Sequence, residues 1–432
     1  MSAKRALPAA PAVLPATHGV KRDKRDADHD FSWSFDAAAR VYVGLYRGGG
    51  QPGAEIAAFD FDGTLSVPKS GKTFPVDGSD YSLLDPRLVA RVREVTRNRR
   101  FVIFTNQAGV DKHTTSAAVR EPVFGLPQLL GPEPCIIFAS VDQNSYRKPR
   151  TGMFDLFCQE YNGGVKVDAH RSVYVGDAAG RPKTSTAKKD HSNADFLFAI
   201  NCGFNFLTPE QLLAGTEVEV AHQANMASLP RPPDPRKWLS EAAAFAQDHG
   251  TGSRFPDEQS FKTVWTQVSS LPRVVVVMVG LPGSGKSTFV QRFCPDWQVV
   301  SCDKTGSMKK CETLLSEYLG QSSCRVVVDN TNFDLKSRSR WLEIVNQAKC
   351  ALLAVWLDVG VDQAIHNVTF RRLAALRSGD LSAQMVPTFV IRNQSKSFQA
   401  PSLQEGFASV FRIFFKPSFR DESLHSLYIQ HL

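Results

Sequence analysis

The sequence predicts two α/β domains, each a doubly wound parallel sheet with helices on both faces. The first observation is an alternation of short β-rich runs with helical stretches, which spans residues 31–213 and resumes near residue 273. The second is the stretch ASLPRPPDPRKW at 227–238, whose prolines cannot continue a helix or a strand. The third is the length of 432 residues, which exceeds what one hydrophobic core usually serves.

These observations divide the chain into four segments. We expect a basic tail without stable structure at 1–30, a first α/β domain at 31–215, a linker at 216–265 and a second α/β domain at 266–432. The predicted strands of the first domain are EIAAFDFD, RFVIFTN, PCIIFAS and RSVYVGDA, separated by helical stretches such as DPRLVARVREVTRN and TGMFDLFCQEYN. Those of the second domain are RVVVVMVG, CRVVVDNTN and CALLAVWLDV, apolar enough for buried parallel strands.

Composition excludes two classes of protein. No apolar run approaches the roughly 20 residues that a membrane-spanning helix needs, so a membrane protein is not predicted. The eight cysteines are scattered without a CxxC pair, which indicates neither a zinc site nor a disulfide framework. We therefore expect reduced thiols in an intracellular compartment.

The positive charge is concentrated in part at the start of the chain. The formal net charge is +8, and basic pairs stand at Lys4-Arg5, Lys21-Arg22 and Lys24-Arg25 among Ala and Pro residues. Such a segment buries too little apolar surface to fold. It fits a nuclear import signal, a solubilising tail or an organelle transit peptide. We expect a nuclear location, with the mitochondrion as the alternative. The charge permits a nucleic acid partner without proving one.

Two aspartates follow the first buried strand in AAFDFDGTL, at 57–65. Ligands bind at the carboxyl ends of parallel strands, and residues two apart point to the same side, so Asp60 and Asp62 can act on one reacting group. One carboxylate can attack phosphorus while the other transfers protons, if a metal and cationic side chains offset the phosphate charge. The alternative for this motif alone is a strand followed by a turn.

Three further strand-end motifs supply such supports. They are VIFTNQAG with Thr105 and Asn106, YRKP with Lys148, and VYVGDAAGR with Asp177. The set DxDGT, TN, Lys before Pro and GDxxGR resembles the haloacid dehalogenase phosphatase superfamily.

That resemblance implies a role for each of these residues. Asp60 would be the nucleophile and Asp62 the general acid and base. Thr105 and Lys148 would hold the phosphate. Mg²⁺ would be held by Asp60, the backbone carbonyl of Asp62, and Asp177.

A phosphate-binding motif opens the second domain. GLPGSGKST fits G-x-x-x-x-G-K-[ST], follows the apolar run 274–279 and precedes the helical FVQRFC, which is the context that the motif requires. We expect Lys286 to reach the β- and γ-phosphates of ATP and Ser287 to bind Mg²⁺. The predicted nucleotide-binding residues are Gly280, Pro282, Gly283, Ser284, Gly285, Lys286, Ser287 and Thr288.

The acceptor side of this second site is predicted from strand ends and one helix. In WQVVSCDKTG an apolar run ends at Asp303, which we take as general base, with a helix cap or a Mg²⁺ ligand as alternatives. The motif VVVDNTN could orient the base or the metal through Asp329, Asn330 and Asn332. HNVTFRRLAALRSGD offers lid cations for the transferring phosphoryl group. We select Arg371 from a set that also holds Arg372 and Arg377, although helix arginines are usually solvated.

The order of the two motif sets resembles the polynucleotide kinase 3′-phosphatase family over most of 31–415, together with YRKPRTGMFD, VDNTNFDLKSR and FQAPSLQEGF. The resemblance implies an enzyme that removes 3′-phosphates from DNA termini and phosphorylates 5′-hydroxyls with ATP. Its partners would be DNA ends at nicks, gaps and double-strand breaks, with RNA ends as a second candidate. We expect a monomer. Animal members carry a forkhead-associated domain that docks repair scaffolds, and roughly 30 residues are too few to hold one, so such docking is expected to be absent.

The sequence departs from the family in two places. DKHTTSAAVREPVFGLPQLLG, at 111–131, lacks the expected basic glycine turn, and Cys302 replaces an arginine. Arg181 and the pair Lys188-Lys189 are either substrate contacts or an exposed basic face. Two other readings stay open, a metabolite phosphatase fused to a metabolite kinase and a repair scaffold with vestigial sites. The complete motifs argue against the scaffold.

Overall fold

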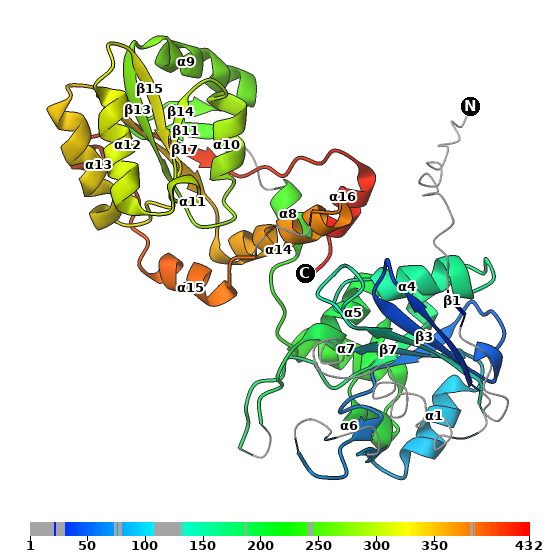
Figure 1. Cartoon of the computed structure of the whole chain (residues 1–432). Coiled ribbons are helices and arrows are strands. Elements are labelled where there is room, and N and C mark those ends of the chain that lie inside the picture. The colour runs from blue at the N-terminus through cyan, green and yellow to red at the C-terminus, as the bar shows by residue number, and fades with distance from the viewer. Residues whose placement is uncertain are drawn as a thin grey trace, which may run out of the picture. The chain divides into compact units, whose positions relative to one another are not determined.

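The structure is a computed structural model in which two compact units are distinguished (Figure 1). Unit 1 is Met1–Pro232 with Gln430–Leu432, and unit 2 is Pro233–Ile429. Among the described residues, no helix has the length and apolar character that crossing a membrane requires. The residues described are 21–22, 31–72, 76, 80–107, 131, 133–185, 188–240, 245–380, 383 and 385–432. Most of the predicted tail and most of the segment 111–131 lie outside them.

Unit 1 is built on a mixed sheet. The strands β8, β7, β4, β9 and β10 pair in parallel, while β3, β2 and β1 continue the sheet as antiparallel strands beyond β8. The predicted α/β class is confirmed, and the antiparallel extension is an addition that the sequence analysis missed. In sheet order the strands are β1 (Lys21–Arg22), β2 (Phe31–Asp36), β3 (Val41–Tyr46), β8 (Cys135–Ser140), β7 (Arg100–Asn106), β4 (Ile56–Phe59), β9 (Val173–Val175) and β10 (Asn205–Leu207), with a separate hairpin of β5 (Ser66–Val67) and β6 (Ser82–Leu83).

Both faces of this sheet are covered, which makes the first unit doubly wound. Alternate residues of β4 point to opposite faces, so Phe59 enters one apolar core and Ala58 enters the other. The first core is closed by α1, α6 and α7, and the second by α4, η2 and α5. The helices are η1 (Arg47–Gly49), α1 (Leu88–Thr96), α4 (Gly152–Leu156), η2 (Phe157–Tyr161), η3 (Ala169–Arg171), α5 (Ala194–Cys202), α6 (Pro209–Ala214) and α7 (Val218–Ser228).

Unit 2 has a second mixed sheet. The strands β17, β16, β13, β15 and β14 pair in parallel, and β11 and β12 add antiparallel pairs at the β17 edge. The central strand β13 is apolar and buried from its second residue on, as expected for a parallel strand covered on both faces. In sheet order the strands are β12 (Arg254–Phe255), β11 (Ala246–Asp248), β17 (Ser409–Phe414), β16 (Ala351–Asp358), β13 (Arg273–Val279), β15 (Cys324–Val328) and β14 (Gln298–Val300).

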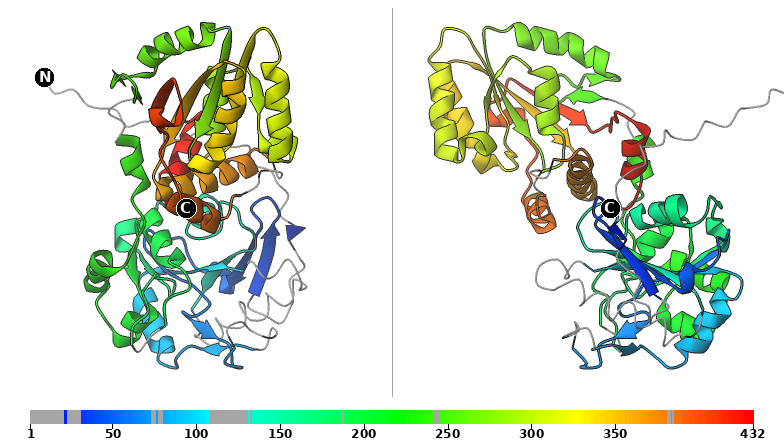
Figure 2. Two further views of the ribbon diagram at one scale, coloured as in Figure 1. Left: turned by 90° about the vertical axis from the view of Figure 1, so that its left-hand side faces the viewer. Right: turned by 45° about the vertical axis from the view of Figure 1, so that its right-hand side comes forward.

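Helices cover the two faces of this sheet, as Figure 2 shows. Phe261 of α9 and Phe289 of α10 close one core, while Leu315 of α12 and Trp341 of α13 close the other. A smaller apolar cluster joins α14 and α15 to Leu281, in the loop that follows β13. The helices are α8 (Pro235–Ser240), α9 (Glu258–Ser270), α10 (Lys286–Phe293), α11 (Cys302–Thr305), α12 (Met308–Leu319), α13 (Leu335–Gln347), α14 (Val361–Arg377), α15 (Thr388–Lys396), η4 (Leu403–Glu405) and α16 (Glu422–Tyr428).

The segment expected as a linker, 216–265, differs from that expectation. It contains α7, α8, β11, β12 and the first part of α9. Asn225 of α7 donates its side-chain amide to the Phe206 carbonyl at 3.0 Å, and Trp265 of α9 is buried in a core of unit 2. The helix α8 and the strands β11 and β12 are short, so local periodicity does not report which unit they join.

Candidate active sites

The first candidate site begins where β4 ends. Asp60 follows directly after Phe59, and its backbone N–H donates to the Val175 carbonyl of the neighbouring strand β9 at 2.8 Å. Its side chain is turned inward, and the residue is 7% exposed. The Nζ of Lys148 donates to Asp60 Oδ1 at 2.6 Å. Two residues that are 88 positions apart in the sequence are thus in direct contact.

Lys148 is fixed at both ends of its side chain. Its Nζ also donates to Asp195 Oδ1 at 2.7 Å and to the Tyr174 hydroxyl at 2.8 Å, and the residue is 4% exposed. At the backbone, Asn106 at the end of β7 accepts from the Lys148 N–H at 2.9 Å and donates to its carbonyl at 3.2 Å. This double anchoring places a compact positive charge against Asp60.

Asp195 and Tyr174 are site residues that the sequence analysis missed. Tyr174 donates its hydroxyl to Asp195 Oδ1 at 2.9 Å, and Asp195 Oδ2 accepts from the Ala178 N–H at 3.0 Å. The one available signal was an acid at the start of the apolar helix ADFLFAIN. Buried acids are rarely unpaired, so this position called for a cationic partner.

Three carboxylates converge beside this lysine. Oxygens of Asp60, Asp177 and Asp195 all lie within 4.8 Å of one another. Burial, reinforced by the Asp195 charge, raises the pKa of Asp60 well above its ordinary value and that of Asp177 to about 6. Carboxylate oxygens are the ligands that Mg²⁺ prefers, and a cation would relieve this repulsion, so the residues fit the predicted metal.

The carboxylate cluster contains one acid beyond the expected metal ligands. The Asp62 side chain is outside the cluster, and Asp195 is in it. The expected contact of Asp62 runs through its backbone carbonyl, so that contact stays a prediction. The adjoining turn needs glycine, because Gly63 has φ +74° and a Cβ there would lie 2.6 Å from Asp177 Oδ2.

Asp62 and Thr105 are linked by one amide. Gln107 Nε2 donates to Asp62 Oδ2 at 2.6 Å and to Thr105 Oγ1 at 3.0 Å. The Asp62 residue reaches the surface, yet the atoms packed around its carboxylate raise its pKa, against the Gln107 hydrogen bond that lowers it. A raised pKa suits a carboxyl group that must both give and take a proton near neutral pH.

Arg181 is engaged by protein groups in unit 1. Its guanidinium donates to Asp190 at 2.8 Å, to Glu210 at 2.8 Å and to the Asp177 carbonyl at 3.1 Å. These contacts brace the loop that carries Asp177. Of the basic residues predicted nearby, Lys188 and Lys189 are the exposed ones.

The pKa shifts predict how Mg²⁺ stabilises unit 1. The pKa of Asp177 rises from 3.8 to about 6 on folding, so its stabilising contribution is complete below about pH 4 and is lost as the pH rises through about 6. Asp60 shifts in the same direction. We expect millimolar Mg²⁺ to raise the melting temperature of unit 1 by about 2–4 °C near pH 8, and much less near pH 5.

Calorimetry of the full chain tests this expectation, with Asp177→Asn as the variant that should lose the gain. Asp85→Asn is the matched control, because Asp85 pairs with Arg87 at the surface of the same unit. An equal Mg²⁺ effect at both pH values would contradict the assignment of the cation to these carboxylates.

The second candidate site follows β13. The loop between β13 and α10 contains Gly280, Gly283 and Gly285, whose φ values are +152°, +84° and +96°. Gly283 approaches α14 so closely that a Cβ would lie 2.4 Å from the Ala364 carbonyl oxygen. The loop therefore requires glycine there for conformation and for space. Its backbone N–H groups and the start of α10 form the environment in which phosphates bind.

Lys286 is buried against this loop. Its Nζ donates to the carbonyls of Gly280 at 2.9 Å and Leu281 at 2.8 Å, and the residue is 9% exposed. Burial lowers its pKa to about 8, a shift that the Asp329 charge opposes. Ser287, the next residue, hydrogen-bonds Asp329. Of the other predicted nucleotide-binding residues, Ser284 is buried, Pro282 is half-buried and Thr288 is exposed.

The negative charges of Asp303 and Asp329 both act on Lys286, and each raises the pKa of the lysine. Asp303 lies on α11 and is exposed, and the neighbouring Cys302 N–H donates to Asn330 Oδ1 at 2.9 Å. This bond holds α11 beside the end of β15. The predicted base, the predicted metal-side acid and the predicted phosphate-binding lysine thus come from three separate strand ends.

Asn332 serves the interior of unit 2. Its side-chain amide donates to the Met278 carbonyl at 2.7 Å and accepts from Trp341 Nε1 at 2.9 Å, and the residue is buried. The suggestion that it orients the base or the metal is therefore corrected. Because both ends of the amide are occupied, Asn332 ties β13 to α13.

Among the three predicted lid arginines, contacts distinguish Arg371. Asn367, one turn earlier on α14, donates to the Gly283 carbonyl at 2.9 Å, and the Arg371 charge helps to lower the pKa of Lys286. Arg372 donates to the Ala383 carbonyl, and Arg377 donates to the Ser423 carbonyl at 3.2 Å. Residues four apart share a helix face, so Arg371 lies on the face of α14 that meets the phosphate-binding loop.

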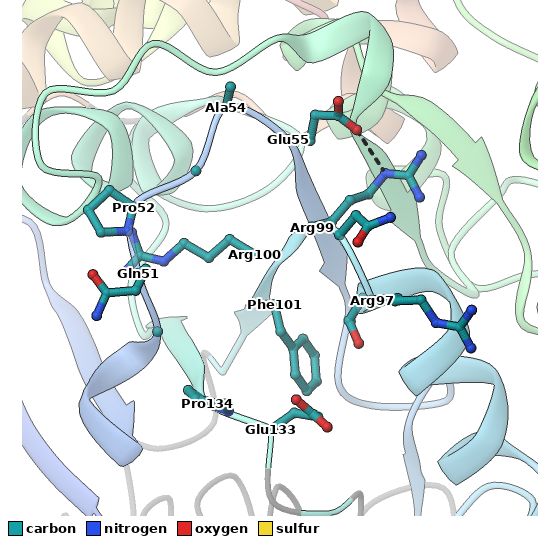
Figure 3. Close-up of a pocket in the computed structure, with 14 residues that line it drawn as sticks. Gln51, Pro52, Ala54, Glu55, Arg97, Arg99, Arg100, Phe101, Glu133 and Pro134 are labelled. Atoms are coloured by element: carbon teal, nitrogen blue, oxygen red, sulfur yellow. Dashed lines mark ion pairs between the residues drawn. The ribbon is translucent and has the colours of Figure 1, made fainter.

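A separate pocket lies at the amino ends of the strands in the unit 1 sheet (Figure 3). Its volume is about 490 Å³, and Glu55 and Arg100 line it at the starts of β4 and β7. Arg99 Nε lies 3.7 Å from Glu55 Oε2, and Arg100 donates to the Tyr161 carbonyl at 2.7 Å. Since Asp60 follows the other end of β4, this pocket is not part of the first candidate site.

The comparisons with known proteins agree with the presence of two separate candidate sites on one chain. Residues 55–213 match the family model described as polynucleotide kinase 3 phosphatase. A bifunctional polynucleotide phosphatase/kinase of Schizosaccharomyces pombe is 29% identical over 395 residues, which cover 90% of this chain and 85% of the relative. Residues 55–213 thus form a polynucleotide kinase 3 phosphatase domain, within a chain that is similar over most of its length to a bifunctional phosphatase/kinase.

Other relatives resemble the chain in whole or in part. A putative bifunctional polynucleotide phosphatase/kinase of Acanthamoeba polyphaga mimivirus is 26% identical over 386 residues, covering 83% of this chain and 84% of the relative. A polynucleotide 3′-phosphatase of Saccharomyces cerevisiae is 26% identical over 217 residues, covering 38% of this chain and 89% of the relative. The likeness to bifunctional relatives over most of the length shows that this chain is an enzyme that joins a phosphatase to a kinase.

Proposed function

We propose that this enzyme heals DNA ends during strand-break repair. Unit 1 removes a 3′-phosphate, and unit 2 transfers the γ-phosphate of ATP to a 5′-hydroxyl. The observation that supports this most is the presence, on one chain, of the Asp60–Lys148 pair and a phosphate-binding loop with Lys286. A phosphatase that acts on the 3′ end of a break and a kinase that acts on its 5′ end would together leave termini that a ligase can join.

In the phosphatase reaction, the ionised Asp60 attacks phosphorus and forms an aspartyl phosphate. Asp62 donates a proton to the departing 3′ oxygen and later takes one from the water that hydrolyses the intermediate. Lys148, with its ammonium 2.6 Å from Asp60, favours the ionised nucleophile and attracts the phosphate, and Thr105 holds a phosphate oxygen. Asp60, Asp177 and the Asp62 carbonyl would hold Mg²⁺, which would supply positive charge to offset the negative charge of the phosphate.

In the kinase reaction, the backbone N–H groups of residues 280–288 and the Lys286 ammonium bind the phosphates of ATP. Asp303 accepts the proton of the attacking 5′-hydroxyl. Arg371 offsets the charge of the transferring phosphoryl group. Ser287, paired with Asp329, is the residue that would hold the Mg²⁺ of the nucleotide.

The proposed partners are DNA ends at nicks, gaps and double-strand breaks, with RNA ends as a second substrate class, and the protein acts as a monomer. We place it in the nucleus, with the mitochondrion as the alternative. The net charge of +8 supports a polyanionic substrate, because cations near a phosphate backbone release its counterions on binding.

Salt dependence on a nicked duplex tests the substrate class. The substrate carries 3′-phosphate and 5′-hydroxyl at the nick and is supplied with Mg²⁺ and ATP. We expect kcat/KM for both reactions to fall roughly tenfold or more between about 50 and 200 mM salt, because several phosphate contacts are screened. Hydrolysis of p-nitrophenyl phosphate by the same preparation should change little.

Two outcomes would contradict DNA end healing. One is a kcat/KM on the nicked duplex that is insensitive to salt. The other is a protein that hydrolyses the small ester while leaving both termini of the nick unchanged, and this second outcome would favour the metabolite phosphatase and kinase fusion.

A further inference from the structure

The last residues of the sequence form part of unit 1. We call Gln430–Leu432 the tail segment. Gln430 Nε2 donates to Thr151 Oγ1 at 3.1 Å, and Gln430 Oε1 accepts from the Thr151 N–H at 3.3 Å. The His431 N–H donates to Asn201 Oδ1 at 2.9 Å, and the His431 carbonyl accepts from Asn201 Nδ2 at 2.9 Å. Two reciprocal pairs of hydrogen bonds therefore bind the tail segment to unit 1.

The two residues that bind the tail segment, Asn201 and Thr151, are linked to the stretch that directly follows Lys148. Asn201 Nδ2 donates to the Pro149 carbonyl at 2.8 Å as well as to His431, and Thr151 stands three residues after Lys148. Thr151 Oγ1 also donates to Asp155 Oδ2 at 2.8 Å, which continues the contacts into α4. Asn201 and the tail segment thus hold the residues that directly follow Lys148.

The opposite end of the same short segment is held by β7. Asn106 makes both backbone hydrogen bonds to Lys148, so residues 148–151 are held from two sides. These contacts are shielded from water, since His431 and Thr151 are buried, at 4% and 8% exposed. The Lys148 ammonium sits between Asp60 and Asp195, and displacement of about 1 Å at such a group can cost a large part of a reaction rate.

We infer that Gln430 and His431 are positioning residues of the phosphatase site. They act through Thr151 and Asn201 to keep the Lys148 backbone where its Nζ meets the nucleophile. This inference rests on the proposed phosphatase role of Asp60 and Lys148. It requires no contact between the tail segment and the substrate, so its effect falls on turnover and not on substrate binding.

Removal of the tail segment from the whole chain of residues 1–432 tests the inference. We expect the chain ending at residue 429 to lose roughly tenfold in phosphatase kcat, with KM changed by less than about twofold, and to keep its kinase kcat. The variant Gln430→Ala, which removes one of the two reciprocal pairs, should lose about threefold and serves if the truncated chain does not fold. A rise in KM with kcat unchanged would overturn the inference.

A control and a double-mutant cycle separate positioning from folding stability. Asn205 also uses its side-chain amide to bind backbone carbonyls, of His170 at 2.6 Å and Ser172 at 3.3 Å, at the edge of the sheet away from Asp60, so Asn205→Ala should leave phosphatase kcat unchanged. In the Lys148→Arg background, removal of the tail segment should cost less than about twofold, because Lys148 is no longer there to be positioned. A full tenfold loss in that background would overturn the inference.

Both assays use p-nitrophenyl phosphate beside the 3′-phosphorylated nick. If the intact enzyme hydrolyses only the small ester, the DNA substrate is wrong, and the cycle on the small ester still decides the role of the tail segment. If kcat on both substrates is unaffected by truncation, the tail segment has no positioning role.

Discussion

Asp60→Asn is expected to abolish release of 3′-phosphate, by on the order of 10³-fold or more, and to leave 5′ phosphorylation unchanged. An amide is too weak a nucleophile to form the acyl phosphate. The substitution keeps the shape of the side chain and an oxygen that accepts from Lys148, so unit 1 should stay folded. The measurement is phosphate release from the nicked duplex, with 5′ phosphorylation followed in the same samples.

The matched control for this variant is Asp85→Asn, which changes an aspartate of the same unit whose partner is the exposed Arg87. It should keep both activities. If Asp60→Asn retained a substantial fraction of phosphate release, the attacking group would have to be another one, such as Asp62 or water.

Lys286→Ala is expected to reduce 5′ phosphorylation by on the order of 10²–10³-fold and to leave phosphate release unchanged. The lysine is the buried cation of the loop that follows β13, and its ammonium would offset charge on the β- and γ-phosphates. Loss of that charge should weaken both ATP binding and the transition state. Kinase kcat and KM for ATP measure the two effects.

Lys262→Ala is the control for the second variant, because Lys262 pairs with Glu258 on the exposed side of α9 in the same unit. It should leave kcat and KM for ATP as they are. A Lys286→Ala enzyme with normal turnover at saturating ATP would mean that the loop binds the nucleotide without stabilising the transferring phosphoryl group.

Together the two variants test whether the activities are separable. Asp60 belongs to unit 1 and Lys286 to unit 2. The hydrogen bond from Lys148 to Asp60 lies within unit 1, and that from Lys286 to the Gly280 carbonyl lies within unit 2. If either variant removed both activities while both proteins stayed folded, the assignment of one reaction to each unit would be wrong.

Local motifs carried most of the catalytic prediction. Each of Asp60, Thr105 and Asp177 stands at or just after the end of an apolar strand, and Lys286 starts a helix after a glycine-rich loop. In a parallel sheet the strand ends share one edge, so residue type and strand position together predict proximity. Lys148 lies eight residues after the end of β8, and its contact with Asp60 across 88 positions was found only in the structure.

The structure decided the orientation of side chains that the sequence could not distinguish. The sequence does not distinguish the three arginines of α14. The contacts of the helix show that Arg371 shares the face of Asn367, which binds the Gly283 carbonyl. Arg372 and Arg377 instead bind the carbonyls of other residues. Asn332 likewise matched a strand-end pattern, yet its amide is occupied by Met278 and Trp341. A motif reports where a residue stands in the chain and not which way its side chain turns.

The sequence by itself determined the fold class, the two reactive strand ends and the phosphate-binding loop, because short apolar periodicity and glycine spacing are local properties. Only the tertiary structure decided the partners of Lys148, the place of α7 and α9, and the membership of the tail segment in unit 1. Asp195 is 47 residues from Lys148, and Gln430 is 279 residues from Thr151. A buried carboxylate or amide acquires its role from such distant neighbours, since burial without a partner costs free energy, and no local pattern records which neighbour meets that need.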